Sequence, residues 1–347
     1  MSRPGDVLTL ICGLGLALVL TGCADSPVET EVATEVADLV WPPAPAPARL
    51  RYRGAFTRGA DLGVEPGLLA RIADVLFGDG EPALIRPMAV VADGDVVHVA
   101  DPGSRGVHRF DRTRGRHDLL RLEDGRPLPS PVGLASAPDG AVMVTDSVLR
   151  ALLRIAPGAQ AAVRVPVSVE LGQPTGVAVD PRTGNVLVAD TAAHAVLVLA
   201  PDGRLIRVIG HRGEAPGNFN FPTYLWIDSA GHLYVTDSLN FRVQVLDLDG
   251  RPLAWFGRAG DASGDIGRHK GVAVDRQGHV YLADGLFQAL QVFDRQGRFL
   301  LSVGQLGDGA GEFWLPTGVF VDGDDRVYVA DSYNRRVQVF EYVGGAR

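Results

Sequence analysis

The chain has 347 residues, of which 46% are hydrophobic and 21% charged, so it is long and apolar enough to bury a sizeable core. Its formal net charge of −8 argues against a nucleic-acid-binding surface, which needs an excess of Lys and Arg to meet the phosphates. Glycine supplies 43 residues, and this content favours many tight turns between short strands rather than a disordered chain.

Residues 1–22 are predicted to be a lipoprotein export signal. Arg3 precedes an apolar stretch from Val7 to Leu20, which is shorter than the roughly 20 residues needed to span a bilayer. The stretch ends in Leu20-Thr21-Gly22-Cys23, which resembles the lipobox at which a bacterial lipoprotein is acylated and cleaved. Cys23 would then be the lipidated N-terminus, and the following Ala24 favours the outer membrane. The alternative is an ordinary secretory signal with an incidental cysteine.

The segment 23–48 is predicted to be a tether. It carries acidic residues and no basic ones, and it ends in WPPAPAPA from Trp41 to Ala48. Alternating Pro and Ala favour an extended polyproline II spacer. Since the other cysteine, Cys12, lies in the signal, the mature chain would contain neither a free thiol nor a disulfide.

A repeat of 44 to 47 residues occupies the rest of the chain, and its clearest marker is an apolar strand that ends in Asp. The six marker residues are Asp101, Asp146, Asp190, Asp237, Asp284 and Asp331. An apolar strand precedes each marker strand and two more follow it, so each unit has four strands. Such a unit cannot bury both faces of its own sheet, and a ring of stacked units is a β-propeller. We expect the marker carboxylates to bond the backbone of the next turn rather than to act in catalysis.

The sequence predicts an all-β, six-bladed propeller over residues 49–347, with repeats at 86–343. The sixth repeat lacks a fourth strand, and the segment 49–56, which contains LRYRGAF, supplies one and would join the two ends of the chain. Between this closing strand and the first repeat, residues 63–78 read as a short helix that covers one end of the ring. A helix that docks a partner is the alternative.

Several repeats resemble the NHL family. The resemblance rests on PTGVAVD from Pro174, YVTDSLNFRVQVLD from Tyr234 and YVADSYNRRVQVFE from Tyr328. The layout of lipobox, Pro-rich tether and six repeats is similar to that of bacterial six-bladed NHL-propeller lipoproteins. The resemblance implies a platform that binds proteins, RNA or other ligands, although related rings include zinc-dependent peptidyl-amidoglycolate lyases. The fold alone therefore does not choose a function.

Candidate binding residues are expected on one face of the ring, which we call the top face. It contains the turns from second to third strand and the connections between blades, of which 211–222, 258–270 and 305–316 are long. Lys270, the only lysine of the chain, occupies the channel mouth where three other repeats have Thr. An anion-binding role and a salt bridge to Asp261 or Asp265 are both open. The candidate ligand-binding residues are Lys270, His269, Tyr224, Thr223, Thr317, Arg242, Asn240, Arg336 and Asn334.

These residues favour a non-enzymatic binding or scaffold propeller, tethered to the periplasmic side of a bacterial envelope, that recognises an envelope protein or an anionic ligand. A lyase or hydrolase with a metal at the central channel is the alternative, but the eight histidines do not assemble into a three-histidine zinc site. We expect no cofactor, while a structural calcium or zinc ion is left open. The expected partners exclude nucleic acid and include the membrane through lipid on Cys23, and the protein is expected to be a monomer.

Overall fold

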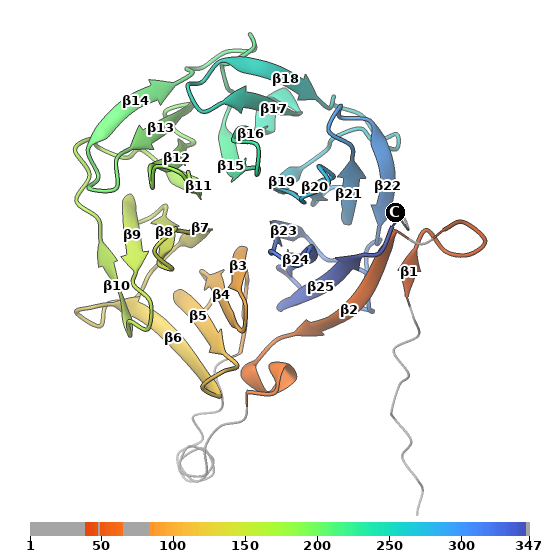
Figure 1. Cartoon of the computed structure of the whole chain (residues 1–347), viewed down its shortest axis with the longest axis horizontal. Helices are drawn as coiled ribbons and strands as arrows, with labels where there is room; N and C mark the ends of the chain where they lie inside the picture. The colour runs from red at the N-terminus through yellow and green to blue at the C-terminus, as the bar shows by residue number, and fades with distance from the viewer. Residues whose placement is uncertain (1–38, 48, 65–82, 345–347) are drawn as a thin grey trace, which may run out of the picture. The chain divides into compact units, whose positions relative to one another are not determined.

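The computed structural model describes residues 39–47, 49–64 and 83–344, and nearly all regular structure in them is β-strand. Residues 49–344 of this set form a ring of six four-stranded antiparallel blades around a central axis (Figure 1). The predicted six-bladed β-propeller is therefore confirmed. In the described part of the chain, no helix is long and apolar enough to cross a lipid bilayer.

The blades follow one another along the chain, and the strands of each blade run outward from the axis. Blade 1 contains β3 (Ala89–Asp93), β4 (Val96–Asp101), β5 (Gly106–Asp111) and β6 (Arg116–Leu122). Blade 2 contains β7 (Pro131–Ser136), β8 (Val142–Asp146), β9 (Ala151–Ile155) and β10 (Ala161–Arg164). Blade 3 contains β11 (Pro174–Val179), β12 (Val186–Asp190), β13 (Ala195–Leu199) and β14 (Leu205–Ile209).

The remaining blades have the same layout, and two short 3₁₀ helices lie in connections. Blade 4 contains β15 (Pro222–Ile227), β16 (His232–Asp237), η2 (Ser238–Asn240), β17 (Arg242–Asp247) and β18 (Pro252–Phe256). Blade 5 contains β19 (His269–Val274), β20 (Val280–Asp284), β21 (Ala289–Phe293) and β22 (Phe299–Val303). Blade 6 contains β23 (Pro316–Val321), β24 (Arg326–Asp331), β25 (Arg336–Tyr342) and β2 (Leu50–Phe56), which is followed by η1 (Gly59–Leu62).

The closing strand is β2, as predicted. It pairs with β25 in antiparallel register from Leu50 opposite Tyr342 to Phe56 opposite Val337. A further strand, β1 (Val40–Trp41), pairs with β2 on its outer side. It lies within the segment expected to be tether throughout, and it joins the propeller because the Trp41 ring packs edge-on against Phe340, with the ring centroids 5.8 Å apart.

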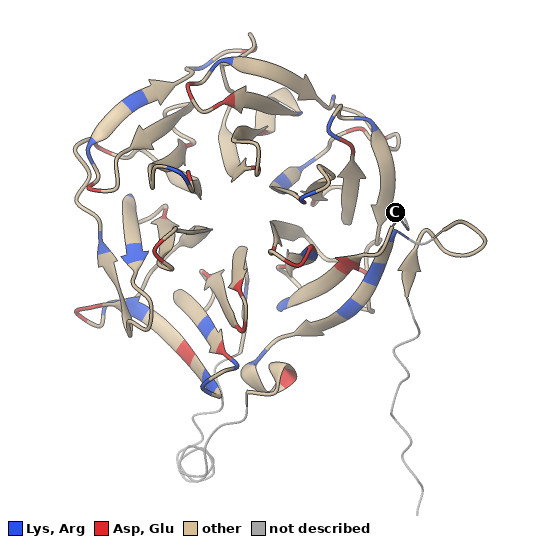
Figure 2. Ribbon diagram, in the orientation of Figure 1, with Lys and Arg blue, Asp and Glu red and all other residues tan. Residues whose placement is uncertain are grey.

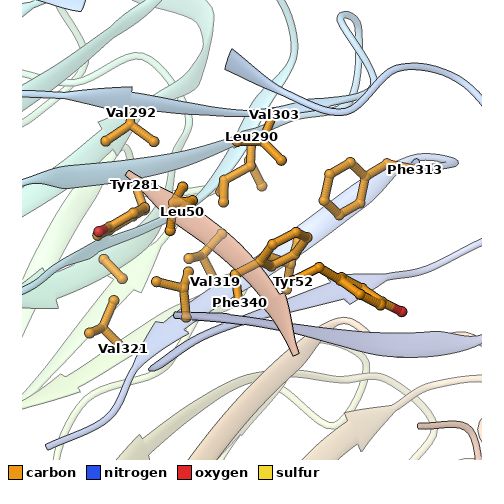
Figure 3. Close-up of a cluster of buried hydrophobic side chains, with 14 residues drawn as sticks. Leu50, Tyr52, Tyr281, Leu290, Val292, Val303, Phe313, Val319, Val321 and Phe340 are labelled. Carbon is orange, nitrogen blue, oxygen red and sulfur yellow. The ribbon is translucent and has the colours of Figure 1, made fainter. Parts of the chain in front are cut away.

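The blades hold together through apolar clusters that each combine side chains of two neighbouring blades. The cluster between blades 5 and 6 includes Leu50 and Tyr52 of the closing strand together with Phe313 and Phe340 (Figure 3). Blades 1 and 2 are also joined at their outer edges, where β6 and β10 pair in parallel. Packing between blades, rather than within one blade, therefore stabilises the ring.

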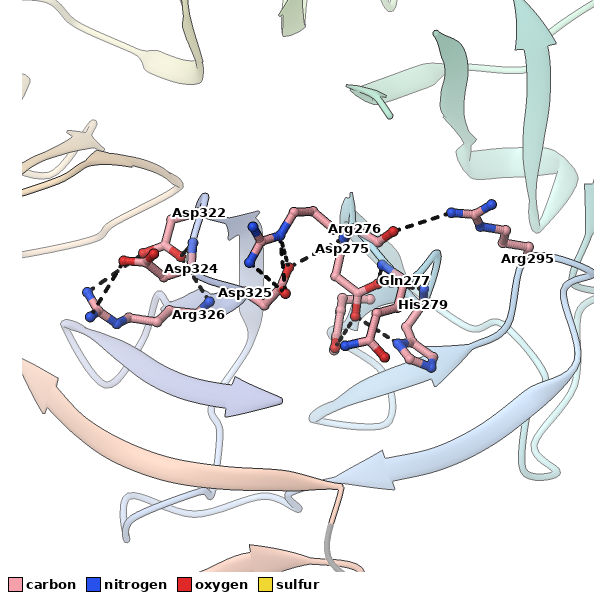
Figure 4. A network of polar contacts seen from close by, with 10 residues as sticks. Asp275, Arg276, Gln277, His279, Arg295, Asp322, Asp324, Asp325 and Arg326 are labelled. Carbon is pink, nitrogen blue, oxygen red and sulfur yellow. Dashed lines mark hydrogen bonds and ion pairs between the residues drawn. The ribbon is translucent and has the colours of Figure 1, made fainter. Parts of the chain in front are cut away.

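Polar contacts add to this packing on the face opposite the top face, which we call the bottom face. Arg276, which follows β19, forms an ion pair with Asp325, just before β24, with 3.1 Å between Nη2 and Oδ2 (Figure 4). Asp275 accepts hydrogen bonds from Tyr281 and from the backbone of His279. The ion pair joins the bottom turns of blades 5 and 6, while the bonds to Asp275 fix the turn within blade 5.

Three predictions fall on residues outside the described ranges. They are the export signal at 1–22 with the acylated Cys23, the tether as far as residue 38, and the greater part of the helix expected over 63–78. Gly63 and Val64 are described, and Gly63 ends η1 with a φ of 72°.

Candidate functional site

The top face is built on the marker aspartates, all of which are buried at the ends of second strands. Asp101, for example, accepts hydrogen bonds from the backbone of Gly103 and Ser104 in the following turn, as predicted. It also accepts them from the backbone of Ile85 and Arg86 in the connection that enters the blade. One carboxylate therefore fixes both kinds of top turn, and this role explains why the marker recurs in every repeat.

Four of the candidate residues bond the backbone of two of the long connections. Arg336 donates to Asp331 and to the backbone carbonyls of Asp308, Gly309 and Glu312. Its neighbour Asn334 donates to Asp331 and to the carbonyl of Gly307. In blade 4 the same arrangement holds connection 211–222, where Arg242 donates to Asp237, Ala215 and Asn218, and Asn240 to Asp237 and Gly213.

Three further candidates lie at the channel mouth with their polar atoms turned into the fold. Thr223 shares a hydrogen bond of 2.8 Å with Ser238, and the buried Thr317 donates to the carbonyls of Pro87 and Ala330. His269 is 2% exposed, and its Nε2 lies 3.1 Å from the carbonyl of Arg242. Burial lowers the pKa of His269 to about 4, so its imidazole is neutral at physiological pH.

Tyr224 closes the channel. Its hydroxyl donates to the carbonyl of Met88, at 3.3 Å, and this contact connects blade 4 with blade 1 on the opposite side of the ring (Figure 1). Burial raises the pKa of the Tyr224 phenol. The Tyr224 side chain therefore spans the axis between these two blades.

Lys270 is the one charged residue among the six equivalent positions at the channel mouth, and no acidic side chain of the described residues pairs with it. Within the described residues no carboxylate lies within 4.0 Å of its ammonium group, and Asp265 instead pairs with Arg258. In blades 3 and 4 the equivalent residues, Thr175 and Thr223, each form a hydrogen bond with the hydroxyl group of the residue that follows the marker Asp. In blade 5 the residue after the marker is Gly285, which has no side chain to bond Lys270. Burial, followed by the charge of Arg268, lowers the pKa of Lys270. The sequence left open a salt bridge from Lys270 to Asp261 or Asp265. In the structure neither carboxylate pairs with Lys270.

Four exposed arginines lie on the same side of the top face as Lys270. They occupy top connections and turns of blades 5, 6 and 1, and no acidic side chain of the described residues pairs with them. These residues are Arg86, Arg105, Arg268 and Arg335. Figure 2 shows that charged residues gather at turns and outer strands and are few on the inner strands. We call these four residues and Lys270 the unpaired cations.

The sequence reasoning missed a set of exposed apolar side chains on the same face as these cations. Val148, Leu239, Leu286 and Tyr333 each stand two residues after a marker Asp and are 50% to 66% exposed. Four others lie in top connections and are 37% to 65% exposed. The complete set, which we call the apolar rim, is Ile85, Val148, Phe221, Leu239, Leu286, Leu306, Trp314 and Tyr333. Aligning the repeats on their markers would have revealed part of it, because the second residue after the marker is large and apolar in four blades.

A metal centre does not emerge from the described residues. No group of three His, Cys, Asp or Glu side chains among them comes together as metal ligands. The histidines act locally instead: His232 bonds Asp228, and His279 bonds Asp275. The ligand set that the lyase-like alternative needs is therefore not assembled in this part of the chain.

Comparison with known proteins agrees with the fold. Residues 171–199 match the NHL repeat, and residues 266–345 match a family described as a 6-bladed β-propeller. The chain is thus a six-bladed propeller with NHL-type repeats, as the resemblance indicated. Comparison with curated protein sequences finds no relative.

Solved structures with this fold have several different activities. An auxiliary nutrient binding protein from Bacteroides ovatus is 13% identical, with a TM-score of 0.58 and coverage of 74% of this chain and 69% of that one. A virginiamycin B lyase from Staphylococcus aureus is 14% identical, with a TM-score of 0.54 and coverage of 75% and 96%. A gluconolactonase from Xanthomonas campestris is 18% identical, with a TM-score of 0.54 and coverage of 84% and 98%. At these identities the likeness concerns the fold.

Proposed function

We propose that this propeller is a membrane-tethered binding platform whose top face docks an acidic segment of another envelope protein. The observation that carries the proposal is the apolar rim, which places eight large, exposed side chains on the same face as the unpaired cations. Exposed apolar patches on folded domains usually mark interaction sites. The five other large, exposed apolar side chains among the described residues lie on the outer strands β10, β14 and β18.

The shape of the site favours a protein over a small substrate. A small-molecule site usually buries most of its ligand in a concave pocket. Tyr224 bridges the axis, and Arg242 and Arg336 hold two of the three long connections in place, which favours a firm surface on the top face. The cations Lys270, Arg268 and Arg335 favour a partner that carries carboxylates. Structural neighbours named as nutrient binding proteins also support a binding role.

The location in the cell is part of the proposal. The sequence Leu20-Thr21-Gly22-Cys23 supports acylation of Cys23, and the acidic segment that follows would separate the propeller from the lipid surface. We place the propeller on the periplasmic side of the bacterial envelope, with the outer membrane favoured by Ala24. No nucleic acid is expected on a chain of net charge −8.

The test uses the single lysine of the chain. If Cys23 is fully acylated, Lys270 carries the only free amine of the mature protein, so an amine-reactive cross-linker applied to native envelopes acts at one site. We expect a defined protein adduct, identified by mass spectrometry, that Lys270→Arg abolishes.

Substitutions at two equally exposed apolar residues compare the top face with the outer strands as the binding surface. Leu239 on the apolar rim and Val208 on β14 are both 52% exposed. Leu239→Glu should reduce the adduct at least fivefold, while Val208→Glu should leave it unchanged. The proposal fails if Lys270 reacts with a small amine reagent in envelopes but gives no protein adduct, or if both substitutions have equal effects.

A further inference from the structure

A pocket of about 330 Å³ opens at the bottom face between blades 1 and 2. Its walls come from β3, β4 and β5 of blade 1 and from β7, β8 and β9 of blade 2, and the bottom turns with Arg114, Gly140 and Gly158 form its mouth. Its volume is in the range of small-molecule sites, roughly 300–1,000 Å³. The pocket is therefore a candidate ligand site that is separate from the unpaired cations and the apolar rim of the top face.

The pocket lies where blade 1 departs from the repeat. In blades 4, 5 and 6 the residue three positions before the marker Asp is a tyrosine, whose hydroxyl donates to the first Asp of the bottom turn, at 3.0 to 3.4 Å. These residues are Tyr234, Tyr281 and Tyr328. Blade 1 has the smaller His98 at this position, the equivalent carboxylate is Asp93, and both line the pocket. Blade 1 thus lacks the phenol ring at this place, and two polar groups remain without the hydrogen bond that the other blades make.

Three polar side chains of the pocket keep their hydrogen-bonding capacity. Within the described residues, the side chains of Asp93, His98 and Ser136 form no hydrogen bond or ion pair. Burial lowers the pKa of His98 to about 4, and the charge of Arg109 adds to this effect while that of Asp111 opposes it. The imidazole is therefore neutral at physiological pH and offers one N–H donor and one acceptor nitrogen. Because the three side chains do not bond one another, they form no nucleophile–base pair, and the pocket is suited to binding.

The charges of the pocket favour a neutral occupant. Arg109 and Asp111, which are 5% and 2% exposed, each have an opposite partner. Arg109 pairs with Asp118 at 2.6 Å, and Asp111 pairs with Arg114 at 2.8 Å. A charged ligand would lose its hydration there without gaining an unpaired countercharge inside the pocket. The exposed Asp93 at the mouth disfavours an anion, and an exposed ion pair between this residue and a cation would add little.

We propose that the pocket between blades 1 and 2 binds one neutral sugar ring of the size of a hexose. Its volume is about twice that of an engineered cavity of about 150 Å³ that takes up benzene, and a hexose has about twice as many non-hydrogen atoms as benzene. Sugar hydroxyls donate and accept, as His98, Asp93 and Ser136 require. The aliphatic side chains of Val91 and Val142, which also line the pocket, offer an apolar surface to the C–H groups of the ring. This site does not depend on the proposed docking of a protein on the top face.

The experiment titrates the full chain, labelled with ¹⁵N-histidine, and follows its imidazole signals by NMR. The neutral probes are D-glucose, D-galactose and D-mannose, and the charged probes are D-glucuronate and D-glucosamine. We expect at least one neutral hexose to shift the signals of His98, assigned with His98→Leu, and to leave those of His194 and His211 on the top face in place. The proposal is overturned if no neutral hexose shifts His98 at up to about 50 mM, if all histidines shift equally, or if a charged probe binds more tightly than every neutral one.

Three variants of one residue then test the pocket by calorimetry with the hexose that binds. His98→Tyr introduces the residue of blades 4 to 6, which would fill the pocket and bond Asp93, so we expect binding to be lost. His98→Leu, which matches Leu187 of blade 3, removes both polar nitrogens and should weaken binding about tenfold. His98→Gln retains a donor and an acceptor and should stay within about threefold of the unmodified protein.

The outcomes separate this site from the top face. Unchanged binding in His98→Tyr would show that the hexose binds elsewhere, and equal binding in His98→Leu and His98→Gln would contradict hydrogen bonding by His98. Leu239→Glu on the top face should leave hexose binding unchanged. Conversely, His98→Tyr should leave the protein adduct of Lys270 unchanged, so the two proposals fail independently.

Discussion

His269 is a candidate ligand residue whose side chain is buried in the fold. Its Nε2 donates to the carbonyl of Arg242, and its Nδ1 is buried without a partner among the described residues. Burial is the main cause that lowers its pKa to about 4. The charged groups that also act on it are Asp284 and Asp237, which raise the pKa, and Lys270, which lowers it. His269 is therefore neutral at physiological pH, and Lys270 alone supplies charge at this point of the channel mouth.

The buried state of His269 predicts a pH dependence of stability. Its pKa in the folded protein, about 4, lies below its ordinary value of 6.5, so the unfolded chain binds more protons between these values. Stability is consequently lost as the pH falls from 6.5 toward 4. In His269→Pro, which introduces the residue found at this place in the other repeats, the loss should shrink by up to roughly 3 kcal/mol. Urea unfolding at several pH values measures this loss of stability. If the unfolding free energies of the two proteins fall in parallel between pH 6.5 and 4, the prediction is refuted.

At the scale of elements, two of the three long top connections are each bonded by one arginine at the start of a third strand. Arg336 binds three backbone carbonyls of connection 305–316 and the buried Asp331. In Arg336→Met the three carbonyls lose their donor, and the buried negative charge of Asp331 loses its cationic partner. We therefore expect the unfolding free energy to fall by about 3 kcal/mol. Hydrogen exchange in residues 305–316 should accelerate.

The neighbouring arginine is the matched control for this prediction. Arg335 is exposed and has no acidic partner among the described residues, so Arg335→Met should change stability by less than about 0.5 kcal/mol. If both variants lose the same stability in denaturant titrations, the contacts of Arg336 do not hold the connection.

The same residues explain what the sequence revealed and what it did not. Alternating apolar runs that end in Asp predict the strands, their order and the closing role of 49–56, because these follow from local patterns and from one missing strand. Sequence position also places Arg242 and Asn334 on the top face. It does not reveal that their donors are used by backbone carbonyls some 27 residues upstream, since that depends on how a long connection folds back. The sequence also does not reveal that Tyr224 crosses the axis, because this depends on its hydrogen bond to Met88 on the other side of the ring.

At the scale of the whole molecule, stability depends on closing the ring, and β2 provides the closure. Leu50, Tyr52 and Phe56 of this strand are buried, two of them against apolar side chains of blade 5 or 6 and the third against blade 1. At about 2 kcal/mol for each buried side chain, the strand contributes roughly 6 kcal/mol, which is comparable to the total stability of many domains. Its loss would also expose the edge of β25.

We therefore expect a chain that begins at residue 57 to lose cooperative thermal unfolding and to aggregate, while a chain that begins at residue 39 melts within a few degrees of the full-length protein. The single substitution Leu50→Ala, at a side chain with 0% exposure, should cost about 3 kcal/mol and keep the transition cooperative. Calorimetry and size-exclusion chromatography distinguish these outcomes. A chain from residue 57 that melted like the full-length protein would mean that packing between blades holds an open ring together, and that β2 only covers an edge.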